Sequence, residues 1–145
     1  MLDFMFVRLR RNAAGNKNVP IIINCNEQNI SKLQSYLREK HHFGFNPSKF
    51  RFATTYSLAV FDQNGKYCLS DKMRLIKKPS GTAACAESLL SPAISKFLQH
   101  EGTEYIYFGG MENLLESPAH PLFLGVMWCE KRKCGVKCVN PIYDS

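Results

Sequence analysis

The strongest structural signal in this sequence is a pair of β-type runs that meet at a tight turn. The first run is FATTYSLAVF at 52–61, the second is YCLSDKMRLIK at 67–77, and DQNGK joins them. Asn64-Gly65 is a dipeptide that two-residue hairpin turns prefer, because both central residues of such a turn adopt positive φ angles. The sequence therefore predicts a β-hairpin in the middle of the chain, and any fold for this chain has to accommodate it.

Further strands and helices are predicted on both sides of this hairpin. Runs rich in Phe, Val, Ile and Tyr predict strands at 4–10, 19–24, 103–110 and 122–128. Apolar residues at helical spacing predict helices over 30–40 and 80–99, and Pro92 should kink the second. This order of elements predicts an α/β sandwich, one sheet with helices packed on it.

The bulk composition predicts one folded domain over residues 1–145. Hydrophobic residues make up 45% of the chain, which is enough for a core. No apolar run approaches the roughly 18 residues that a membrane helix needs, so no membrane association is expected. The apolar part of the start, MLDFMFVRLRRN, is too short for a secretory signal. The net charge of +7 favours a polyanionic partner, most simply nucleic acid.

A thiol and a carboxylate stand two residues apart where the second helix begins, at Cys85 and Glu87. A zinc ion that activates water needs thiolate or imidazole ligands and one open position, and an acid outside the ligand set can move the water's proton. Three more cysteines crowd the last 17 residues, at Cys129, Cys134 and Cys138. The two groups together fit such a site.

These motifs resemble those of the cytidine-deaminase-like superfamily, in particular its bacterial toxin deaminase branch. The likeness spans about residues 52–138: the hairpin, then CAE opening a helix, then a strand, then paired cysteines. It implies a cytidine-deaminase-like sandwich with a mixed central sheet, zinc bound by Cys85, and Glu87 as catalytic proton shuttle. Cys134 and Cys138 are preferred as the other zinc ligands, since their spacing is nearer the family's, and Cys129 stays the alternative.

The function that this resemblance implies is zinc-dependent deamination of a nucleobase, cytosine rather than adenine. The expected partner is single-stranded DNA or RNA, or a nucleotide, and a cognate immunity protein would accompany a toxin. Such a domain would reach the cytoplasm of a target cell as part of a secreted toxin; otherwise the chain would be cytoplasmic.

Two other classes of function remain open at this stage. A helix N-terminus lowers the pKa of a thiol, so Cys85 could be the nucleophile of a papain-like cysteine protease or glutamine deamidase. A small basic α/β protein could also be non-enzymatic and bind an acidic partner, as an immunity protein or inhibitor does. Zinc content and a Glu87→Gln variant would separate these hypotheses.

Overall fold

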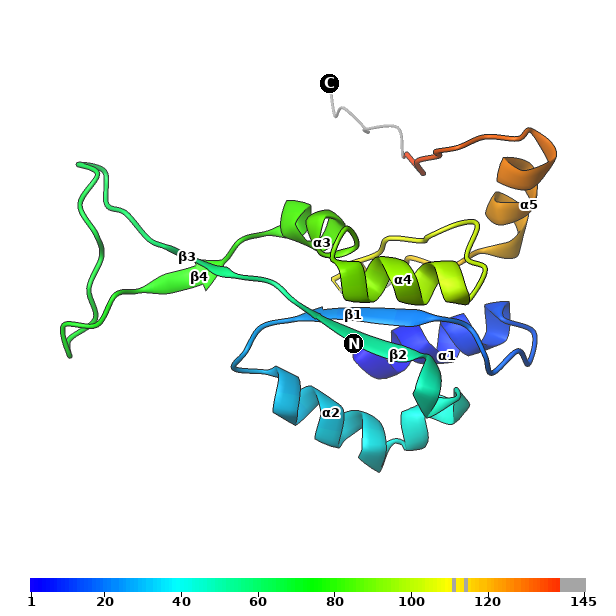
Figure 1. Cartoon of the computed structure of the whole chain (residues 1–145), viewed down its shortest axis with the longest axis horizontal. Coiled ribbons are helices and arrows are strands. Elements are labelled where there is room, and N and C mark those ends of the chain that lie inside the picture. Colours follow the sequence, from blue (N-terminus) through cyan, green and yellow to red (C-terminus); the bar gives the residue numbers. More distant parts are fainter. Residues whose placement is uncertain (111, 114, 139–145) are drawn as a thin grey trace, which may run out of the picture. The chain divides into compact units, whose positions relative to one another are not determined.

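The computed structural model describes residues 1–110, 112–113 and 115–138, and these residues form two compact units (Figure 1). Unit 2 is Asn16–Ile106, and unit 1 combines Met1–Gly15 with the described part of the chain from Tyr107 onward. The single domain expected over 1–145 stays a prediction.

Unit 2 is built around two parallel strands. β1 (Ile21–Cys25) pairs with β2 (Phe50–Thr54) in a register that places Ile21 opposite Phe50 and Cys25 opposite Thr54. Parallel neighbours need a crossover, because the chain must return to the same end of the sheet. Here α2 (Ile30–Glu39) makes the crossover, followed by the short 3₁₀ helices η1 (His41–Gly44) and η2 (Pro47–Lys49). The predicted strand at 19–24 and the predicted helix over 30–40 are confirmed.

Helices lie on both sides of this strand pair, with α2 on one side and α3 (Thr82–Ser88) and α4 (Pro92–His100) on the other (Figure 1). Leu37 of α2 has no exposed surface, and Ile94 and Phe97 of α4 are buried. Pro92 is in the first turn of α4, where its missing N–H costs nothing. The predicted interruption of the 80–99 helix by Pro92 is therefore confirmed.

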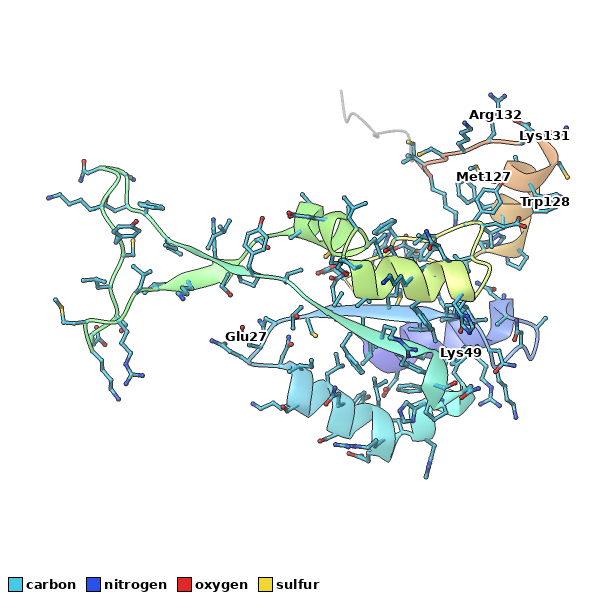
Figure 2. The ribbon with its side chains drawn as sticks, viewed as in Figure 1. Glu27, Lys49, Met127, Trp128, Lys131 and Arg132 are labelled. Atoms are coloured by element: carbon cyan, nitrogen blue, oxygen red, sulfur yellow. The ribbon has the colours of Figure 1, made fainter. Side chains whose placement is uncertain are left out.

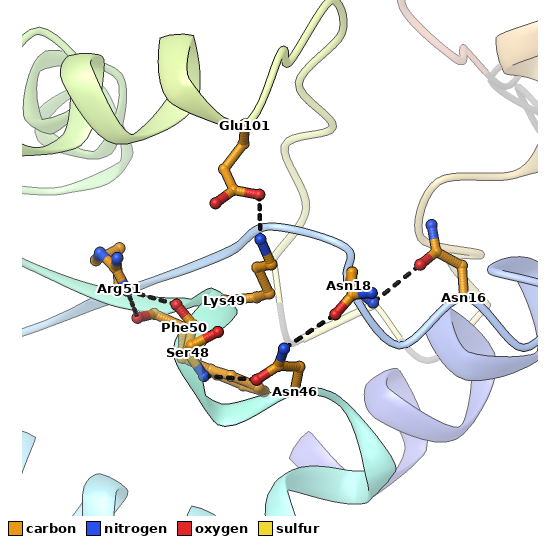
Figure 3. Close-up of polar contacts among 8 residues, drawn as sticks. All are labelled: Asn16, Asn18, Asn46, Ser48, Lys49, Phe50, Arg51 and Glu101. Carbon is orange, nitrogen blue, oxygen red and sulfur yellow. Dashed lines mark hydrogen bonds and ion pairs between the residues drawn. The ribbon is translucent and has the colours of Figure 1, made fainter.

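Polar contacts fix the backbone where it enters β2 (Figure 3). The side-chain amide of Asn46 donates to Asn18 Oδ1 at 3.0 Å, and Asn46 Oδ1 accepts from the backbone N–H of Ser48 at 3.0 Å. The guanidinium carbon of Arg51 lies 3.9 Å from the ring centroid of Phe97, so β2 also contacts α4 through a cation–π interaction.

Residues 57–79 form an arm that extends from the helices and parallel strands of unit 2 (Figure 1). At its base β3 (Ser57–Ala59) pairs antiparallel with β4 (Lys77–Pro79). The location of the predicted turn is confirmed, but its two-residue form is not. Gly65 has φ +76° and its N–H donates to Asp62 O at 3.1 Å, whereas Asn64 does not have a positive φ. The predicted first run, 52–61, is divided, because its beginning belongs to β2 and pairs in parallel with β1.

Unit 1 contains two helices where strands were predicted, so the strand predictions at 4–10 and 122–128 are wrong. α1 (Leu2–Asn12) has Asp3 in its first turn and basic residues in its last, which suits the helix dipole. α5 (Pro121–Cys129) begins with proline. Short apolar runs do not distinguish a strand from a helix by periodicity, and this ambiguity explains both errors.

Side chains of α1 hold the loop that precedes α5. Arg8 Nη1 donates to Glu116 O at 2.7 Å, and Asn12 Nδ2 donates to Ser117 Oγ at 2.8 Å and Pro118 O at 2.7 Å. Burial, reinforced by the Glu116 carboxylate, raises the pKa of the Tyr107 phenol above its usual range. These contacts give unit 1 its internal order.

The α/β class is confirmed, but the finer prediction is not. Within the described residues, the strands form one parallel pair and one antiparallel pair, not a single mixed central sheet. The stretch 103–110, predicted as a strand, is neither helix nor strand. The part of the chain that the structure describes does not show a deaminase fold. No helix in the described part of the chain has the length and apolarity to cross a membrane.

Candidate functional site

A hollow of about 270 Å³ lies where the two parallel strands of unit 2 end. We call it the strand-end hollow. Its lining residues come from the ends of β1 and β2, the start of α2, the base of the arm and α3: Asn24, Cys25, Asn26, Asn29, Thr55, Pro79, Gly81 and Cys85. Segments far apart in the sequence thus meet at the carboxyl ends of the strands, where open α/β sheets bind their ligands.

The loop between β1 and α2 is held by two asparagines of the hollow. Asn26 Oδ1 accepts from the backbone N–H groups of Gln28 at 3.1 Å and Asn29 at 2.9 Å, and Asn29 Oδ1 accepts from Asn26 N at 2.9 Å. These reciprocal bonds set the point at which α2 begins. Glu27 lies on the same loop and is exposed (Figure 2).

A serine of α3 connects that helix to the end of β1. The Ser88 hydroxyl lies 2.7 Å from Cys85 O and 3.1 Å from Asn24 Oδ1. The half-buried Asn24 side chain is therefore oriented by a neighbour on another element. Its amide keeps hydrogen-bonding capacity for a ligand, since a primary amide offers two donors and two lone pairs.

Cys25 and Thr55 line the hollow and are hydrogen-bonded to each other. Thr55 N donates to Cys25 O at 2.9 Å, which extends the parallel pairing one residue beyond the end of β2. Cys25 is 5% exposed, its Sγ lies 3.8 Å from Ala53 O, and burial raises the pKa of its thiol. A thiol held protonated in this way is a poor nucleophile.

Pro79, the last residue of the arm, and Gly81, which follows it closely, both line the hollow. Gly81 has φ +87° and ψ −174°, a conformation that only glycine adopts readily, and it is the residue before α3. The chain therefore turns sharply between the arm and the helix. Because of this turn, the end of the arm and α3 can both contribute residues to the lining of the hollow.

The predicted zinc ligands and the predicted catalytic residue are distributed over both units. Cys85 is half-buried in α3, and the exposed Glu87 places Oε2 3.3 Å from Tyr56 Oη. Cys134 and Cys138 are exposed residues of unit 1. Taken unit by unit, the described residues contain no group of three His, Cys, Asp or Glu placed to hold a metal ion. The zinc site of Cys85, Cys134 and Cys138 stays a prediction.

A larger hollow, of about 620 Å³, lies against α5 in unit 1. Its lining is mostly apolar: Pro121, Leu122, Gly125, Val126, Cys129 and Glu130. Within the described residues, Glu130 is the only charged group of that lining, and it forms an ion pair with Arg132 at 3.0 Å. Figure 2 shows Arg132 just after α5, beside Lys131. With so few polar groups to fix a ligand's orientation, this hollow is the weaker candidate.

Sequence reasoning singled out one residue of the strand-end hollow, Cys85, and missed its polar residues. Asn24, Asn26 and Thr55 were not among the predicted site residues, although Asn24 and Thr55 lie in segments predicted as strands. A signal was nevertheless present, because the polar stretch NCNEQN follows directly after the apolar VPIII and precedes a helix. Polar residues between a parallel strand and its crossover helix face the ligand-binding edge of such a sheet.

Comparison with known proteins identifies a different kinship from the predicted one. No family model matches this chain. It is 26% identical over 93 residues to UDP-N-acetylglucosamine pyrophosphorylase of Saccharomyces cerevisiae, covering 63% of this chain and 20% of that protein. It is 24% identical over 127 residues to UDP-N-acetylhexosamine pyrophosphorylase-like protein 1 of Xenopus tropicalis, covering 88% of this chain and 25% of that protein.

Solved structures show the same kinship at the level of the fold. A putative UDP-N-acetylglucosamine pyrophosphorylase of Entamoeba histolytica matches with a TM-score of 0.72 and 21% identity, covering 90% of this chain and 34% of its own. The enzyme of Trypanosoma brucei, solved with an inhibitor, matches with a TM-score of 0.73 and 22% identity, covering 90% and 29%. This chain spans about a fifth to a quarter of the length of its curated relatives.

These comparisons contradict the predicted deaminase kinship. The relatives are named as pyrophosphorylases or pyrophosphorylase-like proteins, so the predictions of a zinc-dependent nucleobase deaminase, a hydrolase, a toxin and a secreted effector are wrong. The CAE motif was misleading because a cysteine and a glutamate on one turn of a helix also occur without catalysis. The relatives give no support to a cysteine protease or a non-enzymatic inhibitor either.

Proposed function

We propose that this chain carries the nucleotide-binding part of a pyrophosphorylase that acts on UDP-N-acetylhexosamine, with the strand-end hollow receiving the nucleoside. The observation that supports this most strongly is the position of the hollow, at the carboxyl ends of parallel strands, in a fold shared with pyrophosphorylases over 90% of this chain. Ligands of open α/β sheets bind in this position because loops and helix starts converge there.

The chemistry of the lining suits a neutral, hydrogen-bonding group. Three asparagine amides and a threonine hydroxyl line the hollow, and none of the described residues in its lining is a lysine, arginine, aspartate or glutamate. Uracil presents two carbonyl acceptors and one N–H donor, and ribose adds hydroxyl groups. The amides of Asn24 and Asn29 can satisfy both kinds of group, since each carries donors and one remaining lone pair. Asn26 offers donors alone, because its Oδ1 already accepts two backbone N–H groups.

The size of the hollow indicates which part of the ligand it holds. Its volume of about 270 Å³ is below the range of ~300–1,000 Å³ typical of pockets that enclose a drug-sized ligand. A nucleoside matches this volume better than a whole nucleotide sugar does. In the proposed complex, the diphosphate and the sugar therefore extend beyond the rim.

The proposed role of this chain in the reaction is to bind and orient the nucleotide. Transfer of a uridylyl group to pyrophosphate breaks the bond between the α-phosphorus and the sugar phosphate oxygen and forms a bond to a pyrophosphate oxygen. Such displacements depend mainly on positioning and charge stabilisation. A nucleotide is one of the partners predicted from the sequence; single-stranded DNA, RNA and an immunity protein stay predictions.

Calorimetric titration of the chain with UMP, and with AMP as comparator, tests the proposal. We expect saturable binding of UMP that is tighter than that of AMP. The variants Asn24→Ala and Thr55→Val should weaken UMP binding about fivefold or more, the equivalent of ~1 kcal/mol per lost hydrogen bond. Gln28→Ala, an exposed neighbour outside the hollow, is the matched control and should bind like wild type.

Two results would contradict the proposal. One is folded wild-type protein that binds no UMP. The other is binding that the Asn24 and Thr55 variants leave unchanged, since the nucleotide would then be held elsewhere. A parallel assay for UTP formed from UDP-N-acetylglucosamine and pyrophosphate measures whether this chain also completes the transfer.

A further inference from the structure

The described lining of the strand-end hollow offers no positively charged side chain for the phosphates of the proposed ligand, since none of its residues is a lysine or an arginine. The start of α2 offers part of the missing charge through its dipole. Asn26 already accepts the N–H groups of Gln28 and Asn29 in that loop, however, at 3.1 and 2.9 Å. A positively charged side chain beside the rim would complete the site.

The arm supplies cations at its junction with the hollow. β4 consists of Lys77, Lys78 and Pro79, and Pro79 lines the hollow. Side chains of a strand alternate between its two faces, so Lys77 shares the face of Pro79 and Lys78 occupies the other. Two residues of a strand span about 6.6 Å, a distance that a lysine side chain can bridge toward the rim.

The side chains of Lys77 and Lys78 are exposed, and the pairing of β4 with β3 fixes their backbone. Lys77 pairs with Ala59 and Lys78 with Leu58, so the face that each occupies is set by the ladder. The ion pairs found among the described residues are Lys49–Glu101 and Arg132–Glu130, and neither involves the arm. The ammonium group of Lys77 is therefore available to an anionic ligand.

We propose that Lys77 binds the phosphate of the nucleotide that occupies the strand-end hollow. This inference rests on the proposed function and adds a charged binding residue to it. Lys77 gives the site its preference for a nucleotide over a nucleoside, while the asparagines recognise the base and the ribose. Its ammonium acts as a point charge on a flexible stem, which suits a phosphate that lies outside the rim.

The test compares UMP with uridine in wild type and in three variants of β4, two of which each remove one lysine charge, from opposite faces of the strand. Lys77→Gln should weaken UMP binding about tenfold or more and leave uridine binding within about twofold, as expected for one charge-assisted hydrogen bond. Lys78→Gln removes the same charge one residue away and should leave both affinities within about twofold of wild type. Lys77→Arg should restore most of the UMP affinity, and thermal melts should show that all variants fold.

The outcomes separate this inference from the proposed function. Equal effects of Lys77→Gln and Lys78→Gln on UMP would overturn the role of Lys77, since general electrostatic attraction would explain both. Wild type that binds uridine as tightly as UMP would also overturn it and leave the nucleoside site intact. Wild type that binds neither ligand would reject the proposed function and this inference with it.

Discussion

Lys49 Nζ and Glu101 Oε2 lie 2.6 Å apart and connect the residue before β2 to the residue after α4 (Figure 3). Their side chains are 22% and 12% exposed, so the pair is largely shielded from water. Removing one partner of such an ion pair destabilises the fold more than removing both, because the remaining charge is left partly buried without a partner. The pair thus holds a helix against the strand that leads into the strand-end hollow.

Lys49→Met and Glu101→Gln should each lower the free energy of unfolding by about 1–3 kcal/mol. The double variant should lose less than the sum of the two, because it leaves no unpaired charge. Urea denaturation of the four proteins measures this coupling. Additive losses would show that the two side chains do not interact energetically.

Asn26→Ala should lower stability by about 1 kcal/mol and weaken UMP binding together. Its Oδ1 accepts two backbone N–H groups in the loop that starts α2, and these bonds are exposed, which limits their contribution. Chemical denaturation and calorimetric titration provide the two measurements. Gln28→Ala keeps the backbone donor and is the control; if it has the same effect, the Asn26 side chain has no special role.

Glycine-to-alanine substitutions at two positions should change the free energy of unfolding in opposite directions. Gly81→Ala places a side chain at φ +87° and should cost about 1–3 kcal/mol. Gly125→Ala lies within α5, where an added Cβ meets nothing within 4 Å, and should gain about 0.5–1 kcal/mol. Hydrogen exchange measured across a series of denaturant concentrations would assign each change in stability to its own unit. Stabilisation by Gly81→Ala would contradict the positive φ angle of this residue.

The Cys25 thiol should make stability depend on pH in alkaline solution. Burial raises its folded-state pKa above the ordinary value of 9.0, so the folded chain retains this proton to higher pH than the unfolded chain does. The stability that this thiol contributes is complete below about pH 9 and is lost as pH rises through the folded pKa. Urea midpoints between about pH 8 and 10.5 should therefore fall more steeply for wild type than for Cys25→Ala, and parallel curves would contradict this.

Local sequence determined several elements that the structure confirms. Asn64-Gly65 produced the turn of the arm, the IIINC run produced β1, and Pro92 separated α3 from α4. Each depends on backbone preferences or on a residue's own chemistry, which act over a few residues. The α/β class followed from the same signals.

Contacts between distant residues determined several features that sequence reasoning missed. Residues 52–54 pair with β1 in parallel rather than with the hairpin. The errors at α1 and α5 have a local cause, since short apolar runs do not distinguish a helix from a strand. The strand-end hollow exists only because β1, β2, the arm and α3 meet. The sequence by itself thus determined the turn at Asn64-Gly65, the strand at β1 and the helix at α2. Only the tertiary structure decided which segments pair and which side chains share a site, because both depend on packing between residues far apart in the chain.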